Sequence, residues 1–417
     1  MNSEILVQIH PDEAIELLLA QDIDYEMETI SLDDALGRVA AENIYSKVNV
    51  PPFDRSPYDG YAFRGEDTIG ASKDKWVELE VIEEIPAGTW PKYEISSGTA
   101  AKILTGGPVP EGANVCIKYE ETELIDNRIK IFREIQPNTD IVYMGEDRKK
   151  DEVIIEKGDV LNTGEIGELA SQGISKVVVY RKPVVGIFNM GSELTPPEER
   201  LKKGKIYNSN YNALRAFLEN IGMEVIDFGI IKDDEELVEQ KTIESLSLVD
   251  ILITTGGASV GDYEYALSSI KNIGAKVLFW KTAMKPGGSI VVSNIEDKIV
   301  FGLSGNPAAA LLSLYRVGLP FLYKACGRRE LKPETVNVFL KEDLDKNSPA
   351  VRLLRGKLEI DNGKVYFAEN KEQGNGVVSS FVKCDAFAEI PMGSKAVSAG
   401  TLVKAYRVGS LFGSVGE

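Results

Sequence analysis

The stretch from Val249 to Tyr265 constrains the fold of this chain more than any other. It begins with an apolar, mostly β-branched run of strand length, Val249 to Thr254, which is interrupted only by Asp250. Such a run predicts a strand that is buried on both faces of a sheet. The run ends at Gly256-Gly257, and Ser259, a further glycine and two acids follow before the next expected helix. Because ligands of open α/β sheets bind at the carboxyl ends of strands, we expect a binding loop here.

The residues of this loop favour a ligand that carries phosphate. Glycines leave backbone N–H groups accessible to an anion at the start of a helix. For any single loop of this kind, a tight turn without a ligand is the alternative. Two more glycine-containing loops follow apolar runs, KPGG at 285–288 and SGNP at 304–307. Three loops of like chemistry favour a bound ligand over an empty turn.

Strand and helix patterns alternate from residue 182 to residue 315, which predicts a parallel or mostly parallel sheet with helices on both faces. The expected strands are 184–188, 223–229, 249–254, 276–280 and 299–303, and the expected helices are 210–220, 234–244 and 307–315. Acids follow the first three strands: Glu193, then Asp233, then Asp262 with Glu264. Parallel strands bring these acids to one edge, where carboxylates facing a phosphate ligand require a magnesium-like ion between them.

The rest of the chain predicts further domains, because 417 residues exceed one hydrophobic core. Helices are expected at 11–20 and 31–41, and short alternating runs indicate β structure between 76 and 132 and again after residue 327, including a strand at 377–382. We therefore expect a multidomain α/β plus β protein with a small β domain inserted after the N-terminal segment. The expected domains are an N-terminal and linking domain (1–45 and 148–180), a small β domain (46–147), a central three-layer α/β domain (181–329) and a C-terminal β-barrel-like domain (330–417).

Charge and residue counts disfavour several classes of function. The chain has 47 basic and 65 acidic residues and a net charge of −18, which argues against nucleic acid or an anionic membrane as a partner. Its one histidine, His10, lies near an expected helix start, which disfavours histidine-based triads and metal sites. The three cysteines lack the spacing of a thiolate zinc site. We find neither a membrane span nor a signal-peptide pattern and therefore expect a cytoplasmic protein.

Several segments together resemble the molybdopterin molybdotransferase family, which includes bacterial MoeA and the E domain of gephyrin. The segments are DRSPYDGYA (54–62), ILTGGPVPEGAN (103–114), GED (145–147), TTGGASVGDYEY (254–265), FWKTAMKPG (279–287), GNPAAA (305–310) and QGNG (373–376). Most are weak signals singly, but they occur in the family's order over essentially the full chain.

The resemblance implies a reaction, a metal and an assembly. The reaction is insertion of molybdenum from molybdate into adenylyl-molybdopterin, with release of AMP. The metal is Mg²⁺. The assembly is an elongated homodimer in which the small β domain of one subunit faces the α/β domain of the other. Contacts with a molybdopterin adenylyltransferase and with the molybdoenzymes that accept the cofactor are also expected.

The resemblance also assigns roles to individual residues. Catalytic roles fall to Asp59, Thr105, Glu193 and Glu264, and the metal ligands are Glu193, Asp233 and Glu264. The substrate-binding residues are Asp147, Asp233, Gly256, Gly257, Ser259, Lys281, Lys285, Gly305, Asn306, Pro307 and Arg355. The lysines and the glycine amides would supply countercharge to a pyrophosphate and an oxyanion within an acidic protein.

This chain departs from the family's pattern at several of these loops. Met190 and Ser192 stand in place of a hydroxyl and an acid, and Asn208 stands where Asp is common. The other departures are Glu264 for Asp, Ser304 for Pro, Gly288 for Lys and Asn375 for Ser. The loss of two acids either weakens metal binding or marks a subgroup. A non-catalytic scaffold or carrier is therefore one alternative function. A molybdopterin adenylyltransferase is another, because the α/β domain is similar to the stand-alone enzymes of that class. Molybdate and tungstate are dianions of nearly equal size, so the sequence does not discriminate between them.

Overall fold

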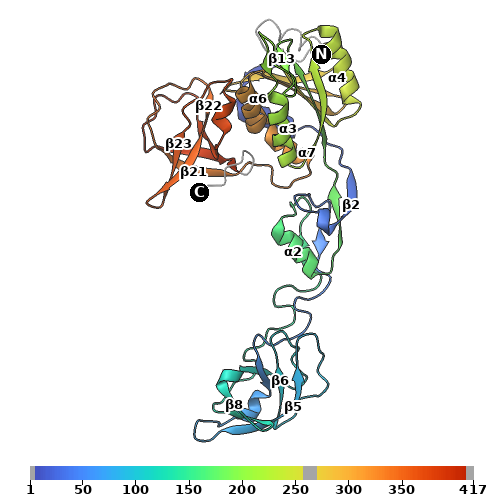
Figure 1. Cartoon of the computed structure of the whole chain (residues 1–417), viewed down its shortest axis with the longest axis vertical. Helices are drawn as coiled ribbons and strands as arrows, with labels where there is room; N and C mark the ends of the chain where they lie inside the picture. The colour runs from blue at the N-terminus through green and yellow to red at the C-terminus, as the bar shows by residue number, and fades with distance from the viewer. Residues whose placement is uncertain (1–4, 257–269, 410–417) are drawn as a thin grey trace.

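The computed structural model describes residues 5–256 and 270–409. Figure 1 shows an elongated molecule with the α/β part and the C-terminal β part side by side at one end. A narrow linking part forms the middle, and the small β part lies at the other end. The multidomain α/β plus β architecture is therefore as predicted.

A seven-stranded sheet forms the centre of the α/β part, with the strand order β1-β17-β19-β20-β16-β12-β15. The strands are β1 (Leu6–Ile9), β12 (Val184–Met190), β15 (Glu224–Ile231), β16 (Ile251–Thr255), β17 (Lys276–Thr282), β19 (Ile290–Ile295) and β20 (Lys298–Leu303). All neighbours pair in parallel except β19, which is antiparallel to β17 and to β20. The mostly parallel sheet is confirmed.

The sequence analysis missed strand β19. It forms a hairpin with β20 through Glu296 and Asp297, and both turn residues have positive φ. Glycine or asparagine usually marks a two-residue hairpin of this kind in a sequence, and this turn contains neither residue. The apolar run at 290–292 was a signal for this strand, but without a recognisable turn it was not separated from β20.

Helices cover both faces of the sheet, as a three-layer domain requires. They are α1 (Pro11–Leu19), α3 (Asn210–Asn220), α4 (Glu235–Leu246), α6 (Pro307–Ser313), a π-helical turn (Leu314–Gly318) and α7 (Leu319–Ala325). Ile251 and Ile253 of β16 share a core with α1, α3, α6 and α7. Leu252, which points to the other face, packs with Val238 and Leu246 of α4. Period-two alternation thus sends successive side chains of one buried strand into two cores.

The first strand and the first helix belong to this α/β part, whereas the sequence analysis placed residues 1–45 in the linking domain. Leu6 of β1 is in register with Phe279 of β17. Ala14 and Leu18 of α1 are fully buried in the core that α3, α6 and α7 share. Which sheet a short strand joins depends on contacts distant in sequence, and local pattern does not report those.

The linking part is built from two small strand pairs and one helix. β2 (Met27–Ser31) pairs antiparallel with β11 (Lys176–Tyr180), and β3 (Ile44–Tyr45) pairs with β10 (Val153–Ile155). Helix α2 (Thr163–Ser171) starts with a capping box of Asn162 and Glu165.

The helix predicted at 31–41 is wrong. Ser31 does cap a turn, but the turn is a 3-10 helix of three residues, Leu32–Asp34. Gly37 then adopts φ +74°, and its N–H donates to the carbonyl of Leu161. The capping signal at Ser31 is therefore confirmed, whereas hydrogen bonding to a distant segment determines the conformation of the residues that follow.

The small β part contains a six-stranded sheet in the order β7-β4-β6-β5-β9-β8. The strands are β4 (Gly60–Phe63), β5 (Val77–Ile85), β6 (Thr99–Ile103), β7 (Val115–Lys118), β8 (Thr122–Ile125) and β9 (Arg128–Ile131). Tyr61 and Phe63 pack into one core on this sheet, and Ala62 packs into a second core.

The C-terminal β part closes into a five-stranded barrel. Its strands are β21 (Thr335–Leu340), β22 (Val351–Asp361), β23 (Lys364–Glu369), β24 (Ala386–Ile390) and β25 (Leu402–Arg407). The ring closes because β22 pairs with both β23 and β24. The strand predicted at 377–382 is instead a 3-10 helix, Val378–Phe381, which buries Phe381 against the α/β part.

The α/β part and the barrel share one core. Tyr315 lies in the π-helical turn, and its ring centroid is 5.0 Å from that of Phe387 in β24. The next residue, Arg316, is only 5% exposed and forms ion pairs with Asp12 (2.5 Å) and Glu389 (2.6 Å). A buried charge must be paired to be tolerated, so these contacts fix the barrel against helix α1.

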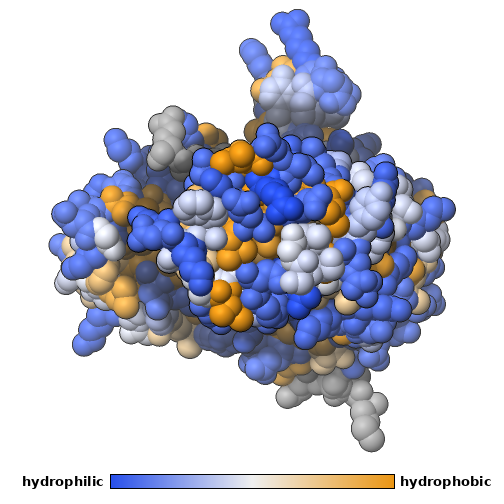
Figure 2. Space-filling view, turned by 90° about the horizontal axis from the view of Figure 1, so that it is seen from below, coloured by the Kyte–Doolittle hydropathy of each residue, from blue (hydrophilic) through white to orange (hydrophobic). Residues whose placement is uncertain are grey.

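The surface matches the composition. The face seen in Figure 2 is mostly hydrophilic, and its hydrophobic residues occur in small groups. Exposed single hydrophobic residues are ordinary on soluble domains. Within residues 5–256 and 270–409, every helix is too short or too polar to traverse a bilayer.

Candidate active site

Asp59 and Thr105 form a pair on the small β part. Asp59 precedes β4, and Thr105 follows β6, the neighbouring antiparallel strand. The backbone N–H and the hydroxyl of Thr105 both donate to Oδ1 of Asp59, each at 2.7 Å. These hydrogen bonds stabilise the charged carboxylate and lower the pKa of Asp59, first through the backbone N–H and then through the hydroxyl. Both side chains are exposed, as an encounter with substrate requires.

A glycine makes this arrangement possible. A Cβ on Gly60 would lie 1.7 Å from the carbonyl oxygen of Ile117 in β7, so no other residue fits. The close approach of β7 leaves Asp59 at the sheet edge with Thr105 beside it. The motif Asp-Gly at 59–60 therefore has a packing reason in addition to the chemical one.

Asp147 lies where the chain leaves the small β part. Its backbone N–H donates to the carbonyl of Val50 at 3.0 Å. A cavity of about 620 Å³ next to it is lined by Val50, Pro51, Pro52, Arg55, Val142, Glu146 and Asp147. Asp147 thus borders a cavity between the two chain segments that connect the small β part to the linking part.

Glu193 and Asp233 lie close together at the carboxyl edge of the large sheet. The backbone N–H of Ser192 donates to Oδ2 of Asp233 at 3.3 Å. The Glu193 carboxylate folds back over Gly191, where an added Cβ would lie 2.6 Å from its Oε2. Among the described residues no group of three acids, histidines or cysteines is placed to hold a metal. Glu264, the third predicted ligand, lies outside the described residues, as do Gly257 and Ser259.

The turns after β12, β16 and β20 meet at this edge. Gly256 has φ +96°, and a Cβ there would lie 2.1 Å from the carbonyl oxygen of Met190. Its N–H donates to the carbonyl of Leu303 at 3.3 Å. A Cβ on Gly305 would lie 3.4 Å from Cα of Gly256. The structure thus brings Gly256 and Gly305 close together, and Gly256 is the position that requires glycine.

A buried amide network lies beneath these turns. Asn208 Nδ2 donates to Asn189 Oδ1 (2.9 Å), and Asn189 Nδ2 donates to Thr255 Oγ1 (2.6 Å). Asn210 Nδ2 donates to the carbonyl of Gly305 at 2.9 Å. The sequence analysis did not identify Asn189 or Asn210 as site residues. Their signal was weak, because single asparagines are common at helix starts and in strands near a loop.

Lys281 lies near the end of β17, and Lys285 lies in the segment between β17 and β19. Lys281 has φ +62°, and its Nζ lies 4.4 Å from the centroid of the Trp280 ring. Lys285 is in β18 (Met284–Lys285), which pairs in parallel with β22 of the barrel. A Cβ on Gly287 would lie 2.9 Å from the backbone N of Ser313, so this loop runs directly against α6.

The N-terminus of α6 meets a barrel loop. Asn306 is the N-cap residue and Pro307 the first helical residue. The N–H groups of Ala308 and Ala309 donate to the carbonyl of Asn375, at 3.0 and 3.3 Å. A Cβ on Gly376 would lie 3.6 Å from Asn306 Oδ1. Loop 373–376 therefore occupies two amides that the sequence analysis expected to face an anion.

Arg355 lies in the same region and is fully buried. Its side chain is 0% exposed, and its three guanidinium nitrogens lack a hydrogen-bond partner among the described residues. Its backbone N–H and carbonyl are both bonded to the side-chain amide of Gln373. Desolvation lowers the pKa of Arg355 to about 10, with weaker opposing effects from Cys384 and Glu369. An unpaired buried guanidinium is costly, and a bound anion would remove that cost.

The predicted residues form one group beside the large sheet and a second group on the small β part. Lys285, Asn306, Pro307 and Arg355 are brought together at the boundary of the α/β part and the barrel, and Glu193, Asp233, Gly256 and Gly305 lie at the adjoining sheet edge. Asp59 and Thr105 lie on the small β part, which Figure 1 shows at the far end of the molecule from the large sheet. Within one chain these two groups do not meet.

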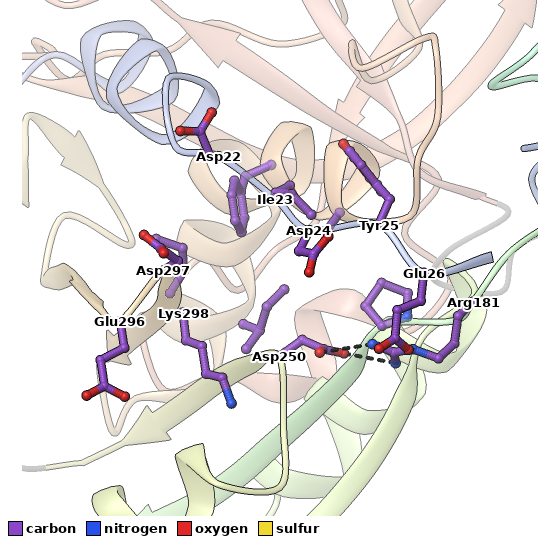
Figure 3. Close-up of a pocket in the computed structure, with 15 residues that line it drawn as sticks. Asp22, Ile23, Asp24, Tyr25, Glu26, Arg181, Asp250, Glu296, Asp297 and Lys298 are labelled. Carbon is purple, nitrogen blue, oxygen red and sulfur yellow. Dashed lines mark hydrogen bonds and ion pairs between the residues drawn. The ribbon is translucent and has the colours of Figure 1, made fainter.

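A further cavity lies at the opposite ends of the strands and contains none of the predicted site residues. It measures about 350 Å³ and is lined by Asp22, Ile23, Asp24, Tyr25, Glu26, Arg181, Pro183, Asp250, Ile251, Glu296, Asp297, Lys298, Ile299, Phe321 and Ala325. Figure 3 shows Arg181 and Asp250 paired on one side of it. Two nitrogens of Arg181 bond the two oxygens of Asp250, at 3.1 and 3.0 Å. Arg181 also pairs with Glu26 at 2.5 Å.

Three protein-family models match successive parts of the chain. The MoeA N-terminal region (domain I and II) matches residues 9–173. A probable molybdopterin binding domain matches residues 186–324. The MoeA C-terminal region (domain IV) matches residues 337–408.

Individual relatives match over almost the whole chain. Molybdopterin molybdenumtransferase of Staphylococcus epidermidis is 34% identical over 403 residues, which cover 97% of this chain and 96% of the relative. The Staphylococcus aureus protein of the same name is 34% identical over 391 residues, which cover 94% of this chain and 93% of the relative. The crystal structure of a molybdopterin biosynthesis MoeA protein from Pyrococcus horikoshii superimposes with a TM-score of 0.84 at 32% identity, covering 96% of this chain and all of that one.

Proposed function

The chain belongs to the MoeA family of molybdopterin molybdenumtransferases, and we propose that it inserts molybdenum from molybdate into adenylyl-molybdopterin, with release of AMP, at the carboxyl edge of its large sheet. The enzyme is a transferase of molybdenum cofactor biosynthesis. The finer assignments of residues, metal and assembly follow from the geometry of the site as our proposal.

The observation that carries the proposal is the buried, unpaired guanidinium of Arg355 beside three loops. Loop 285–287 packs against α6, loop 305–307 leads into α6, and loop 373–376 bonds both the N-terminus of α6 and the backbone of Arg355. A tetrahedral oxyanion would satisfy the guanidinium with charge-assisted hydrogen bonds. Lys285, from the first of these loops, would neutralise the second charge of a dianion. We therefore place molybdate at this boundary.

The adenylyl-molybdopterin would lie along the adjoining edge. Gly256 and Gly305 contact each other there without side chains, which leaves room for a ligand close to the backbone. Lys281 would supply countercharge to the pyrophosphate, and Glu193 would orient the group that attacks it. Positioning and fixed charge would supply most of the rate enhancement in such a transfer.

A divalent ion fits part of this edge. Carboxylate oxygens are the ligands that Mg²⁺ prefers, and Glu193 and Asp233 already lie close together. We propose that these two residues and Glu264 hold Mg²⁺. When bound, the ion would neutralise charge on the phosphates during cleavage. Asp233 in turn would fix the Ser192 peptide through the hydrogen bond at 3.3 Å.

The separation of Asp59 and Thr105 from this edge supports a homodimer. The elongated shape keeps the small β part away from the large sheet of its own chain. In a dimer of two such chains, the Asp59 carboxylate would instead face the large sheet of the partner. Its lowered pKa would keep it ionised for hydrogen bonding or for accepting a proton.

The test is release of AMP from purified adenylyl-molybdopterin with Mg²⁺ and either molybdate or tungstate. We expect oxyanion-dependent release by the wild type and loss of that dependence in Arg355→Met. Lys357→Met, an exposed position on the same strand, is the matched control and should behave as the wild type. Tight binding of the nucleotide without release would indicate the scaffold function, for which the neutral Ser192 and Asn208 provide a rationale.

A further inference from the structure

The backbone N–H and the backbone carbonyl of Ser192 are bonded to side chains of opposite charge. Its N–H donates to the carboxylate of Asp233 at 3.3 Å. Its carbonyl accepts a hydrogen bond from Nζ of Lys205. Because Glu193 follows directly, the anion on one side and the cation on the other fix the turn that presents the proposed catalytic carboxylate. Lys205 was not identified by the sequence analysis.

The backbone brings Lys205 to this place. β13 (Leu194–Thr195) and β14 (Ile206–Tyr207) pair in parallel, and the loop between them returns at Gly204, which has φ +77°. The N–H of Ile206 donates to the carbonyl of Glu193 at 3.0 Å. Lys205 is therefore anchored one residue before a strand that is bonded to Glu193 itself. Lys205 is partly buried, and its ammonium bonds the Ser192 carbonyl.

The turn around Ser192 carries few acids. Ser192 and Asn208 both have neutral side chains. Asn208 is also committed elsewhere, because its Nδ2 bonds Asn189 and its Oδ1 accepts the N–H of Tyr211 at 3.4 Å. The turn at Ser192 is thus flanked by the carboxylates of Glu193 and Asp233 and by the ammonium of Lys205. Fewer acids attract a divalent ion less strongly, and a fixed ammonium supplies part of the same countercharge.

We propose that Lys205 is a positioning residue that holds the Glu193 turn and supplies fixed positive charge at the transfer edge, so that this chain needs less divalent cation than one with acids at 192 and 208. The kinetic test of this inference depends on the proposed function, because it measures AMP release. The metal-binding test does not depend on the proposed function.

The kinetic test follows AMP release across a range of Mg²⁺ concentrations in Lys205→Ala, Lys205→Arg and Lys203→Ala. Lys203 is exposed in the same loop and is the matched control. At low Mg²⁺ we expect Lys205→Ala to lose about tenfold to 100-fold in activity, which is the range for residues that support a site without touching substrate. At high Mg²⁺ the loss should shrink, because the ion replaces the missing charge. Lys205→Arg should restore most of the activity.

The binding test measures Mn²⁺ by electron paramagnetic resonance without substrate. Removal of a neighbouring cation should tighten Mn²⁺ binding several-fold in Lys205→Ala, whereas simple damage to the turn would weaken it. Ser192→Asp adds an acid at the same turn and should also tighten binding. It serves as the second variant if Lys205→Ala does not fold.

The outcomes separate the two proposals. A loss of activity that does not change with Mg²⁺, together with unchanged or weaker Mn²⁺ binding, would show that Lys205 is only structural and would overturn this inference. Absence of AMP release by the wild type under every condition would overturn the proposed function. The Mn²⁺ measurement would still decide the role of Lys205 in that case.

Discussion

Oδ1 of Asp59 accepts two hydrogen bonds from one residue, the backbone N–H and the hydroxyl of Thr105, at 2.7 Å each. Thr105→Val removes the hydroxyl and keeps the backbone donor, which is the larger cause of the lowered pKa. We therefore expect the pKa of Asp59 to rise part of the way toward its ordinary value, as followed by ¹³C NMR of the carboxyl group. The acidic limb of the pH profile of AMP release should move to higher pH by the same amount. An unchanged pKa would mean that the hydroxyl does not act on Asp59 in solution.

The Arg355 guanidinium makes the stability of the protein sensitive to oxyanions. Its pKa is lowered to about 10 by burial, so the folded state disfavours its charged form. Stability at neutral pH is therefore reduced by this group and should recover as pH rises above about 10 toward the pKa of the unfolded state. At neutral pH, molybdate or tungstate should raise the melting temperature by binding the charged form. The same anions should have little effect on Arg355→Met, and an equal increase in that variant would contradict the assignment.

The pair of Arg181 and Asp250 joins the linking part to the large sheet. Asp250 also accepts the N–H of Val184 at 2.7 Å, and its two oxygens bond two nitrogens of Arg181. Asp250→Asn breaks the bidentate geometry, and we expect a wider distribution of distances between labels on the small β part and on α4, measured by pulsed electron resonance. Arg215→Gln removes an exposed pair with Glu219 on α3 and is the control that should leave the distribution unchanged. An equally narrow distribution of distances in Asp250→Asn would show that the pair does not hold the two parts together.

The ion pair of Arg316 and Glu389 should contribute strongly to stability because both groups lie inside the shared core. Burial opposes the charged guanidinium, while Tyr406 and Glu389 outweigh that effect and raise the pKa of Arg316. Arg316→Met leaves Glu389 buried without its partner, and we expect the free energy of unfolding to fall by about 3–5 kcal/mol. The double variant Arg316→Met, Glu389→Leu should regain much of this loss. Urea denaturation of both variants measures the difference, and additive losses would contradict the coupling.

Gly256 is a position where only glycine fits. Its φ of +96° and the distance of 2.1 Å from a Cβ to the Met190 carbonyl oxygen combine backbone strain with a clash. Gly256→Ala should therefore destabilise the protein by at least about 1–3 kcal/mol, which is the cost of the strain alone. Gly167 in α2 has open space around its Cβ position, so Gly167→Ala should stabilise by about 0.5–1 kcal/mol. Equal effects of the two substitutions in urea denaturation would contradict this account.

How far the sequence predicts this molecule depends on the range of the interactions involved. Buried β16 was predictable because its apolar run is local, and Gly256 was predictable as a special position because the glycine itself is the signal. The absence of a helix at 31–41 was not predictable, because Gly37 pairs with Leu161 and that contact is distant in sequence. Lys205 was missed for a similar reason. A lysine in a polar loop looks like a solvated residue until the parallel pairing of β13 and β14 brings it to Ser192.

The same distinction applies to the anion site. The motifs at 305–307 and 373–376 were recognised separately, but the hydrogen bonds from Ala308 and Ala309 to the Asn375 carbonyl appear only in three dimensions. These bonds show that loop 373–376 caps α6, so that the amides of Ala308 and Ala309 are already paired. Arg355 itself was assigned by resemblance. Its complete burial could not be inferred, since arginines are rarely buried unless they are paired.

The shared core has a consequence for how this protein could be altered over evolutionary time. Tyr315 contacts Phe387 and Tyr406 across the boundary near residue 330, so a cut there would divide one cooperative unit. The two core clusters of the small β part, in contrast, draw all their residues from 61–135 and 62–141. The small β part can therefore be replaced without disturbing the other cores, whereas substitutions in the core shared by the α/β part and the barrel affect both parts. The chain therefore has more domains than it has units that can evolve independently.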